Sequence, residues 1–133
     1  MKTLSLIIKR EFFDKILSGE KTIEFREIRP TTASRYIYYI NNDNGQIVAP
    51  KDIKDAPDTP GGYSYEPIKY DAIRLFVGYN KNRASAVVEV KDAQIYEITD
   101  ENNEVIIYEH EGQEYPLSEI RYTLGKVLEK ENC

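Results

Sequence analysis

KREFFDKILSGEKTIEFREIR, residues 9–29, is the stretch that decides the expected fold of this chain. Its first half places apolar side chains at helical spacing, with charged side chains on the other face. The apolar residues are Phe12, Phe13, Ile16 and Leu17. Gly19 follows directly, where a helix that ends in a left-handed residue favours glycine. We therefore expect a helix of about two turns that ends and reverses at Gly19–Glu20.

The second half of the stretch, KTIEFR at residues 21–26, has the alternation of a strand. Ile23 and Phe25 take one set of positions, and Glu24 and Arg26 share what we expect to be the polar face. Lys21 stands at the start of this strand, next to the end of the helix. Ionisable side chains thus gather at a junction between loop and strand, where binding and catalytic sites are often built.

The motif G-x-K-x-x-E-x-R at residues 19–26, preceded by a short helix that ends in Ile-Leu-Ser-Gly, resembles the signature of the ASCH domain family. The similarity continues in residues 72–79 and 85–91, and in YTLGK at residues 122–126. The resemblance implies an α+β chain with a PUA-like fold. Such a fold is a small β-barrel of about six mixed strands, with short helices at the barrel ends.

Length and composition are those of one globular domain over residues 1–133. Hydrophobic residues make up 41% of the chain, and no apolar run is long enough to span a membrane. The only cysteine is Cys133, which excludes a disulfide within the chain and a cysteine-based metal site. We expect a cytoplasmic protein that contacts no membrane and carries neither a metal nor a cofactor.

The charges are distributed unevenly along the chain. A net charge of −5 argues against a general nucleic-acid binder, because neutralising phosphates takes clustered Lys and Arg. Residues 1–35 carry eight basic and five acidic residues, a net charge of +3. Residues 92–133 carry three basic and eleven acidic residues, a net charge of −8. Because Lys21 and Arg26 lie in the positive part, an anionic ligand can be drawn to them locally.

Strands are also expected before and after this stretch. Residues 3–8, TLSLII, are nearly all apolar and predict a first strand that is buried on both faces. Residues 35–40, RYIYYI, predict a third strand. Residues 41–69 contain four of the six prolines and a glycine pair, so we expect a long loop insertion over the barrel mouth. The tyrosines of this segment either line a ligand or anchor the loop; they are Tyr63, Tyr65 and Tyr70.

The rest of the chain, from residue 70 onward, contains a hairpin and weaker strand signals. AIRLFVG at residues 72–78 and SAVVEVK at residues 85–91 predict the clearest hairpin. Residues 105–109, VIIYE, form another strand candidate. Further on, apolar residues have helical spacing but Gly125 interrupts it. The family resemblance implies instead a final strand at residues 120–124.

The usual catalytic motifs are absent from the sequence. His110 is the only histidine, which excludes metal sites that need two, and no Gly-x-Ser-x-Gly or glycine-rich phosphate loop occurs. The resemblance nevertheless implies one enzymatic activity, because a branch of the ASCH family hydrolyses acetylcytidine with a lysine, a threonine and a glutamate. Lys21 matches that lysine, and Glu24 stands where the branch has its threonine. The family glutamate corresponds to Glu101 or Glu104.

The role of Lys21 depends on its neighbours. A lysine that acts as a base must lose its proton, which desolvation or the cation of Arg26 favours. A carboxylate alongside keeps the lysine protonated. If Glu24 pairs with Lys21, the lysine is a cationic anchor; if Glu24 pairs with Arg26, the lysine is more available for chemistry. The sequence is compatible with both.

These residues support two main hypotheses. The first is an ASCH-type binding module that recognises RNA or a nucleotide-like ligand in a cleft beside residues 19–29. The expected ligand contacts are Gly19, Lys21, Thr22, Glu24, Arg26, Tyr38 and Tyr65. The alternative is a small amidohydrolase that deacylates an acylated nucleoside such as acetylcytidine. Its catalytic residues would be Lys21 as the activating residue, Glu24, and Glu101 or Glu104 as a second acid. A nuclease, or a protein-interaction role for the acidic C-terminal third, is a weaker reading.

Overall fold

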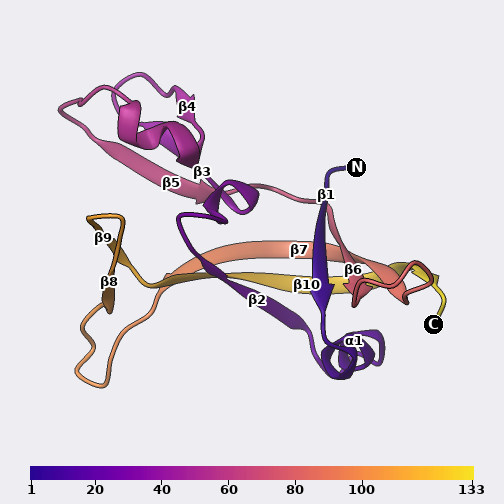
Figure 1. Ribbon diagram of the computed structural model, residues 1–133. Coiled ribbons are helices and arrows are strands. Elements are labelled where there is room, and N and C mark those ends of the chain that lie inside the picture. Colours follow the sequence, from indigo (N-terminus) through magenta and orange to yellow (C-terminus); the bar gives the residue numbers. More distant parts are fainter. The chain divides into compact units, whose positions relative to one another are not determined.

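The computed structural model describes residues 1–133 (Figure 1). Half of the residues lie in strands, and the chain divides into two compact units. Unit 1 comprises residues 1–24, 69–93 and 121–133, and unit 2 comprises residues 25–68 and 94–120. Three strands contribute residues to both units, namely β2 (Ile23–Ile28), β7 (Ser85–Glu97) and β10 (Ser118–Glu131). The single domain over residues 1–133 stays a prediction.

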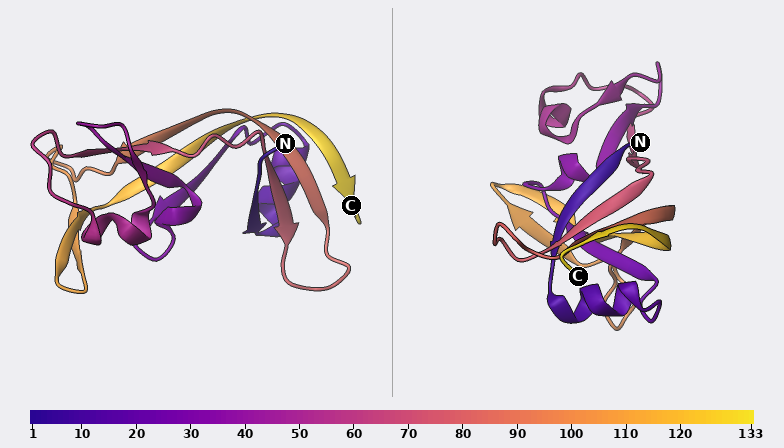
Figure 2. Two further views of the ribbon diagram at one scale, coloured as in Figure 1. Left: turned by 90° about the horizontal axis from the view of Figure 1, so that it is seen from above. Right: turned by 90° about the vertical axis from the view of Figure 1, so that its right-hand side faces the viewer.

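The largest sheet has the strand order β1-β6-β7-β10-β2. In unit 1, β1 (Thr3–Ile8) pairs in parallel with β6 (Ala72–Val77), and Figure 2 shows these two strands side by side. β6 pairs antiparallel with the first part of β7, which confirms the predicted hairpin. The sheet combines parallel and antiparallel pairs, as expected for a mixed sheet, and the chain as a whole is mostly β with few helices. The strand order, however, begins at β1 and ends at β2, and no pairing between these two strands closes the sheet. A closed barrel is therefore not confirmed.

The first strand is buried on one face only, which corrects the expectation of burial on both faces. Leu4, Leu6 and Ile8 are buried, whereas Thr3 and Ser5 are exposed and Ile7 is half-buried. β1 stands at one end of the strand order with β6 as its single neighbour, and only the face that carries Leu4, Leu6 and Ile8 is covered. A run of apolar residues is typical of a parallel strand in the interior of a sheet. The composition of β1 alone, however, does not show whether the strand lies in the interior or at the edge.

The helix α1 (Arg10–Leu17) confirms the predicted two turns that end before a glycine. Phe13 and Ile16 are its buried residues, and α1 contacts β6. Gly19 has a φ of 83°, and its N–H donates to the carbonyl of Ile16 at 3.1 Å. This left-handed residue ends the helix and turns the chain towards β2. Fully buried side chains of the strands complete the core of unit 1: Leu6, Ile73, Leu75, Val87, Val88 and Tyr122.

Unit 2 contains a small sheet with β3 (Ile37–Asn41) at its centre. β4 (Ile47–Val48) and β5 (Tyr63–Pro67) pair antiparallel with its two sides. The 3-10 turns η1 (Ala33–Arg35) and η2 (Pro50–Asp55) accompany this sheet (Figure 1). The predicted third strand thus exists, but it begins two residues later than expected because residues 33–35 form η1.

Residues 41–69, expected as a long loop, contain β4, η2 and β5. Asn41 organises the turn that follows β3, since its side-chain oxygen accepts from the N–H groups of Asp43 and Asn44 at 2.9 and 3.3 Å. Pro50 begins η2, where its missing N–H costs nothing. The prolines of this segment therefore mark the start of a 3-10 turn and the end of a strand as well as loop.

Unit 2 also contains the hairpin of β8 (Ile107–His110) and β9 (Gln113–Pro116). Glu111 and Gly112 connect the strands with φ values of 50° and 80°, which is the geometry of a two-residue hairpin turn. The strand predicted at residues 105–109 is thus present but shifted towards the C-terminus. The predicted final strand is confirmed as β10, which is much longer than residues 120–124. No helix combines the length and the apolarity that crossing a membrane requires.

Candidate functional site

Four of the predicted site residues lie in unit 1, at the turn between α1 and β2. Gly19 is the left-handed residue of that turn. Lys21 is half-buried: its ammonium group donates to the carbonyl of Ile23 at 2.5 Å and lies 5.8 Å from the ring centroid of Phe12. The carbonyl of Thr22 accepts from the N–H of Leu124 at 2.8 Å. This turn therefore presents its lysine along an aromatic ring and joins its backbone to β10.

The faces of β2 are opposite to the expected ones. Glu24 is only 6% exposed and Ile28 only 8%, whereas Ile23 and Phe25 are 43% and 55% exposed. The alternation was predicted correctly, but the expectation that Glu24 lies on a polar outer face was wrong. A carboxylate is costly to bury unless it is hydrogen-bonded or paired. Among the residues of the motif, Glu24 thus has the least exposed side chain.

The other predicted site residues belong to unit 2. Arg26 is half-buried in β2. The hydroxyl of Tyr38 donates to Glu66 at 3.2 Å. Glu101 and Glu104 are exposed in the turn between β7 and β8, where the carboxylate of Asp100 accepts from the N–H of Glu104 at 3.1 Å. Tyr65 is the one predicted residue that lines the pocket of unit 2.

That pocket, called the tyrosine pocket below, has a volume of about 70 Å³. It is lined by the end of β2, by η1, by β3 and β5, and by the β8–β9 hairpin with the start of β10. Most of its wall is aromatic or aliphatic, and its only charged residue is Arg29. The lining residues are Ile28, Arg29, Pro30, Ala33, Ile37, Tyr39, Tyr65, Tyr108, Tyr115, Pro116 and Ser118.

Its four tyrosines form two cross-strand pairs. Tyr39 of β3 lies opposite Tyr65 of β5, with ring centroids 6.1 Å apart and the rings edge to face at 70°. Tyr108 of β8 lies opposite Tyr115 of β9, with centroids 5.8 Å apart and the rings stacked at 27°. Aromatic pairs of this kind stabilise antiparallel strands. All four tyrosines also line the tyrosine pocket.

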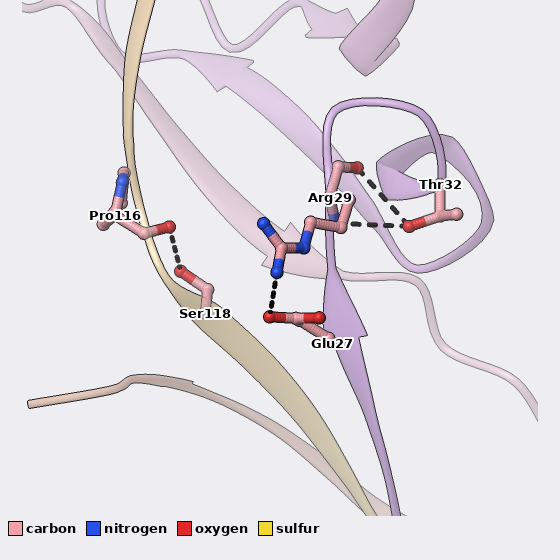
Figure 3. A network of polar contacts seen from close by, with 5 residues as sticks. All are labelled: Glu27, Arg29, Thr32, Pro116 and Ser118. Atoms are coloured by element: carbon pink, nitrogen blue, oxygen red, sulfur yellow. Dashed lines mark hydrogen bonds and ion pairs between the residues drawn. The ribbon is translucent and has the colours of Figure 1, made fainter. Parts of the chain in front are cut away.

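Arg29 follows β2 and is held by its neighbours, as Figure 3 shows. Nη2 of Arg29 lies 2.7 Å from Oε1 of Glu27. The Arg29 N–H donates to the hydroxyl of Thr32 at 3.2 Å, and the Arg29 carbonyl accepts from the N–H groups of Thr32 and Ala33 at 2.9 and 2.8 Å. The guanidinium lies 4.6 Å from the ring centroid of Tyr108. The turn after β2 thus fixes a planar cation at the pocket wall.

Opposite the arginine, the start of β10 supplies a hydroxyl. Ser118 is buried, and its Oγ donates to the carbonyl of Pro116 at 3.3 Å (Figure 3). Pro116 ends β9 and lines the pocket as well. Because the Ser118 hydrogen is directed at that carbonyl, the lone pairs of Oγ remain to accept from a ligand.

The protonation of the pocket is fixed at neutral pH. Burial raises the pKa of Tyr39 above its ordinary value of 10.0. Burial, and then the charge of Glu97, raise the pKa of Tyr65, whose hydroxyl lies 3.4 Å from that carboxylate. The hydrogen bond to Glu27 raises the pKa of Arg29. The site therefore presents the neutral hydroxyls of Tyr39 and Tyr65 and one permanent cation, Arg29.

Sequence reasoning missed Arg29, Tyr39, Tyr108 and Tyr115. A signal for the last two was present, because Tyr108 and Tyr115 stand symmetrically about Glu111–Gly112, a dipeptide suited to a tight hairpin turn. Arg29 lies three residues after the motif, and it precedes Pro30, a position that is typical of the end of a strand. No sequence pattern joins Tyr39 to Tyr108, since they come from separate sheets.

Comparison with protein families identifies the ASCH domain family. The model described as the ASCH domain matches residues 6–127, which is nearly the whole chain. No curated protein and no solved structure matches the chain. The match includes the helix, the motif of β2 and the residues that line the tyrosine pocket. This chain therefore belongs to the ASCH domain family.

Proposed function

We propose that this protein is an ASCH-type binding module that recognises RNA or a nucleotide-like ligand by holding a base in the tyrosine pocket. The observation that carries the proposal is the wall of that pocket, with four tyrosines and Arg29 around an open apolar space. Membership in the ASCH family supports, at the level of the family, a PUA-like module that binds RNA.

Ring faces are what single-stranded nucleic acids require of a protein. Stacking of a base on an aromatic side chain contributes about 1–3 kcal/mol, whatever the identity of the base. Tyr65 is 37% exposed, so part of its ring is open to a ligand. Tyr39 is less exposed, and its ring lies next to that of Tyr65 in an edge-to-face contact. The pair thus combines a partly exposed ring with a less exposed neighbour that contacts it edge to face.

Polar groups at the rim supply the edge contacts. The guanidinium of Arg29 has five N–H donors, of which Glu27 engages only part. Base carbonyls and ring nitrogens are suitable acceptors for the remaining donors. The oxygen of Ser118 accepts from a base amine. A base therefore finds a ring face, a donor and an acceptor in one site.

The charged motif of β2 has a separate place in the proposal. Gly19, Lys21, Thr22, Glu24 and Arg26 remain proposed ligand contacts, with Lys21 and Arg26 directed at phosphate or carbonyl oxygens. The half-buried Lys21 keeps its ammonium group near the surface, which such a role requires. Tyr38 is the one expected contact that the proposal leaves out, because its hydroxyl donates to Glu66 and the residue lies outside the lining of the tyrosine pocket.

A deacylase remains the second candidate, and the burial of Glu24 favours it. Acid–base groups in enzymes are commonly carboxylates removed from water. Lys21 precedes Glu24 by three positions, at the turn between α1 and β2. In this mechanism Lys21 activates an attacking water, and Glu24 transfers a proton to the departing amino group of cytidine. The N–H groups of Gly19 and Lys21 do not serve the oxyanion, because they donate to the carbonyls of Ile16 and Lys15. Release of cytidine from acetylcytidine by the wild type, abolished in Lys21→Ala, is the expected result for an enzyme.

The binding proposal is tested by equilibrium titration with the four ribonucleosides and with a short single-stranded RNA that contains all four bases. We expect Tyr65→Ala to weaken binding of every probe by about tenfold, which corresponds to the loss of one stacking contact. Lys21→Ala with Arg26→Ala should weaken the RNA more than the nucleosides, since only the RNA contains linked phosphates. Tyr79→Ala, a change at a tyrosine that is 84% exposed in unit 1, is the control. Binding that Tyr65→Ala leaves unchanged would contradict the proposal.

A further inference from the structure

Glu27 neutralises the only cation in the lining of the tyrosine pocket. Its carboxylate lies 2.7 Å from Nη2 of Arg29, and the two side chains are 46% and 43% exposed. A second carboxylate, that of Glu97, lies 3.4 Å from the hydroxyl of Tyr65. The pocket and its rim therefore combine one positive charge with two negative charges.

The contacts of Arg29 leave only part of its guanidinium group accessible to a phosphate. One nitrogen of the guanidinium already donates to Glu27. One face lies over the ring of Tyr108 at 4.6 Å. A phosphate that approached the remaining edge would come close to Glu27 and would be repelled by it. A neutral carbonyl accepts from the same edge without that repulsion.

From this arrangement we propose that Glu27 makes the tyrosine pocket select an uncharged base over a phosphate group. The inference rests on the proposed function, and it specifies the chemical class that the pocket takes: the neutral, planar base of a nucleoside. The phosphate of a nucleotide then adds little to binding at this pocket, and Glu27 acts as its specificity residue.

The pocket wall agrees with a neutral ligand. Tyr39 and Tyr65 are uncharged at neutral pH, and the aliphatic lining offers nothing to an anion. Stacking on a tyrosine ring does not depend on a net charge of the base. Binding of a base should therefore depend weakly on salt, whereas binding of a phosphate depends on it strongly.

The test compares each nucleoside with its own monophosphate by isothermal titration. The probes are adenosine and uridine, each with its 5′-monophosphate, and the proteins are the wild type, Glu27→Gln and Glu66→Gln. Glu66→Gln is the matched control, because it removes the same charge from unit 2 at a residue bonded to Tyr38, outside the pocket lining. Both glutamates are exposed, so neither change should disturb folding.

In the wild type we expect the nucleoside and its monophosphate to bind with affinities within about twofold of each other. In Glu27→Gln the preference should move towards the monophosphate by about threefold or more at low salt, and the shift should disappear at about 0.5 M salt. Glu66→Gln should leave the preference unchanged. Adding Arg29→Gln to Glu27→Gln should remove the gain, because the exposed cation is then lost.

Two results would overturn this inference alone. One is a wild-type preference for the monophosphate of about tenfold or more; the other is an unchanged preference in Glu27→Gln, while the nucleosides still bind in a manner that Tyr65→Ala weakens. A wild-type protein that binds none of the four probes and no RNA would contradict the proposed function, and the role of Glu27 would fall with it.

Discussion

The guanidinium of Arg29 lies 4.6 Å from the ring centroid of Tyr108, so the residue after β2 contacts the hairpin of β8 and β9. The contact joins the end of β2 to a part of the chain far away in sequence. It also fixes the one cation of the tyrosine pocket in a single orientation, because Glu27 holds its edge and Tyr108 its face. The position of the cation in the tyrosine pocket thus depends on the contact between Arg29 and Tyr108.

Arg29→Lys should weaken base binding by about two- to fivefold, although the charge is kept. Lysine has neither the planar face that rests on Tyr108 nor the fork of donors that engages Glu27 and a ligand together. The measurement is the dissociation constant for a nucleoside. Arg35→Lys makes the same change in η1, outside the pocket lining, and should leave the constant unchanged. Equal effects of the two changes would contradict the role of Arg29.

The inverted faces of β2 predict which substitutions destabilise the fold. Glu24→Ala should lower the free energy of unfolding by about 1–3 kcal/mol, since truncating this buried side chain removes its packing contacts and leaves a void. Ile23→Thr should change it by less than about 0.5 kcal/mol, because Ile23 is 43% exposed. Urea unfolding of both variants gives the comparison. The reverse order would mean that Glu24 lies on the outer face.

The turn after α1 predicts a cost of backbone strain. Gly19 has a φ of 83° and open space where a Cβ would stand, so any loss in Gly19→Ala comes from the backbone alone. We expect that loss to be about 1 kcal/mol in the free energy of unfolding. Asparagine tolerates this conformation better, and Gly19→Asn should lose less. A fully stable Gly19→Ala would show that the turn does not need its left-handed residue.

Alkaline pH should reduce stability through the tyrosine pocket. Burial raises the pKa of Tyr39 and of Tyr65 above 10.0, so the folded state holds these protons more tightly than the unfolded state does. Their contribution is fully present below about pH 10 and is lost as the pH rises through the raised values. Urea unfolding between about pH 9 and pH 11.5 should show a smaller decline in Tyr39→Phe with Tyr65→Phe than in the wild type. An identical decline in the two proteins would contradict this account of the pocket.

Local patterns predicted the elements of unit 1 well. The bounds of β1, the two turns of α1, the glycine after it and the β6–β7 hairpin all follow from periodicity and turn chemistry over short stretches. The ASCH family was also identifiable from the motif at residues 19–26. These features depend on neighbours in the sequence, which is why a single sequence reveals them.

Local patterns did not predict which face of β2 is buried, nor did they predict the short strands within residues 41–69. Alternation shows that a strand has two faces, but the choice of the buried face depends on what packs against it, and Glu24 is on that face. In the segment 41–69, the short strands β4 and β5 form only by pairing with β3, and prolines hide that pairing in the sequence.

Of the residues that line the tyrosine pocket, the sequence predicted only Tyr65 as a site residue. Its walls come from three places in the chain, and each tyrosine alone is as typical of a strand as of a site. The cross-strand register that pairs Tyr39 with Tyr65 and Tyr108 with Tyr115 is a long-range property. The register accounts for each pair, and the two pairs meet only because two separate sheets of unit 2 line the same pocket.

The most direct test of the central claim is the NMR spectrum of the protein with isotope-labelled tyrosine rings, recorded during a titration with uridine and then with adenosine. The protein has 11 tyrosines, so the pocket can be compared with its own background. We predict that the ring signals of Tyr39, Tyr65, Tyr108 and Tyr115 move together and saturate, while those of Tyr38 and Tyr79 stay in place. Ring signals that stay unchanged throughout, or that move only at tyrosines outside the pocket, would contradict the claim that this pocket binds a base.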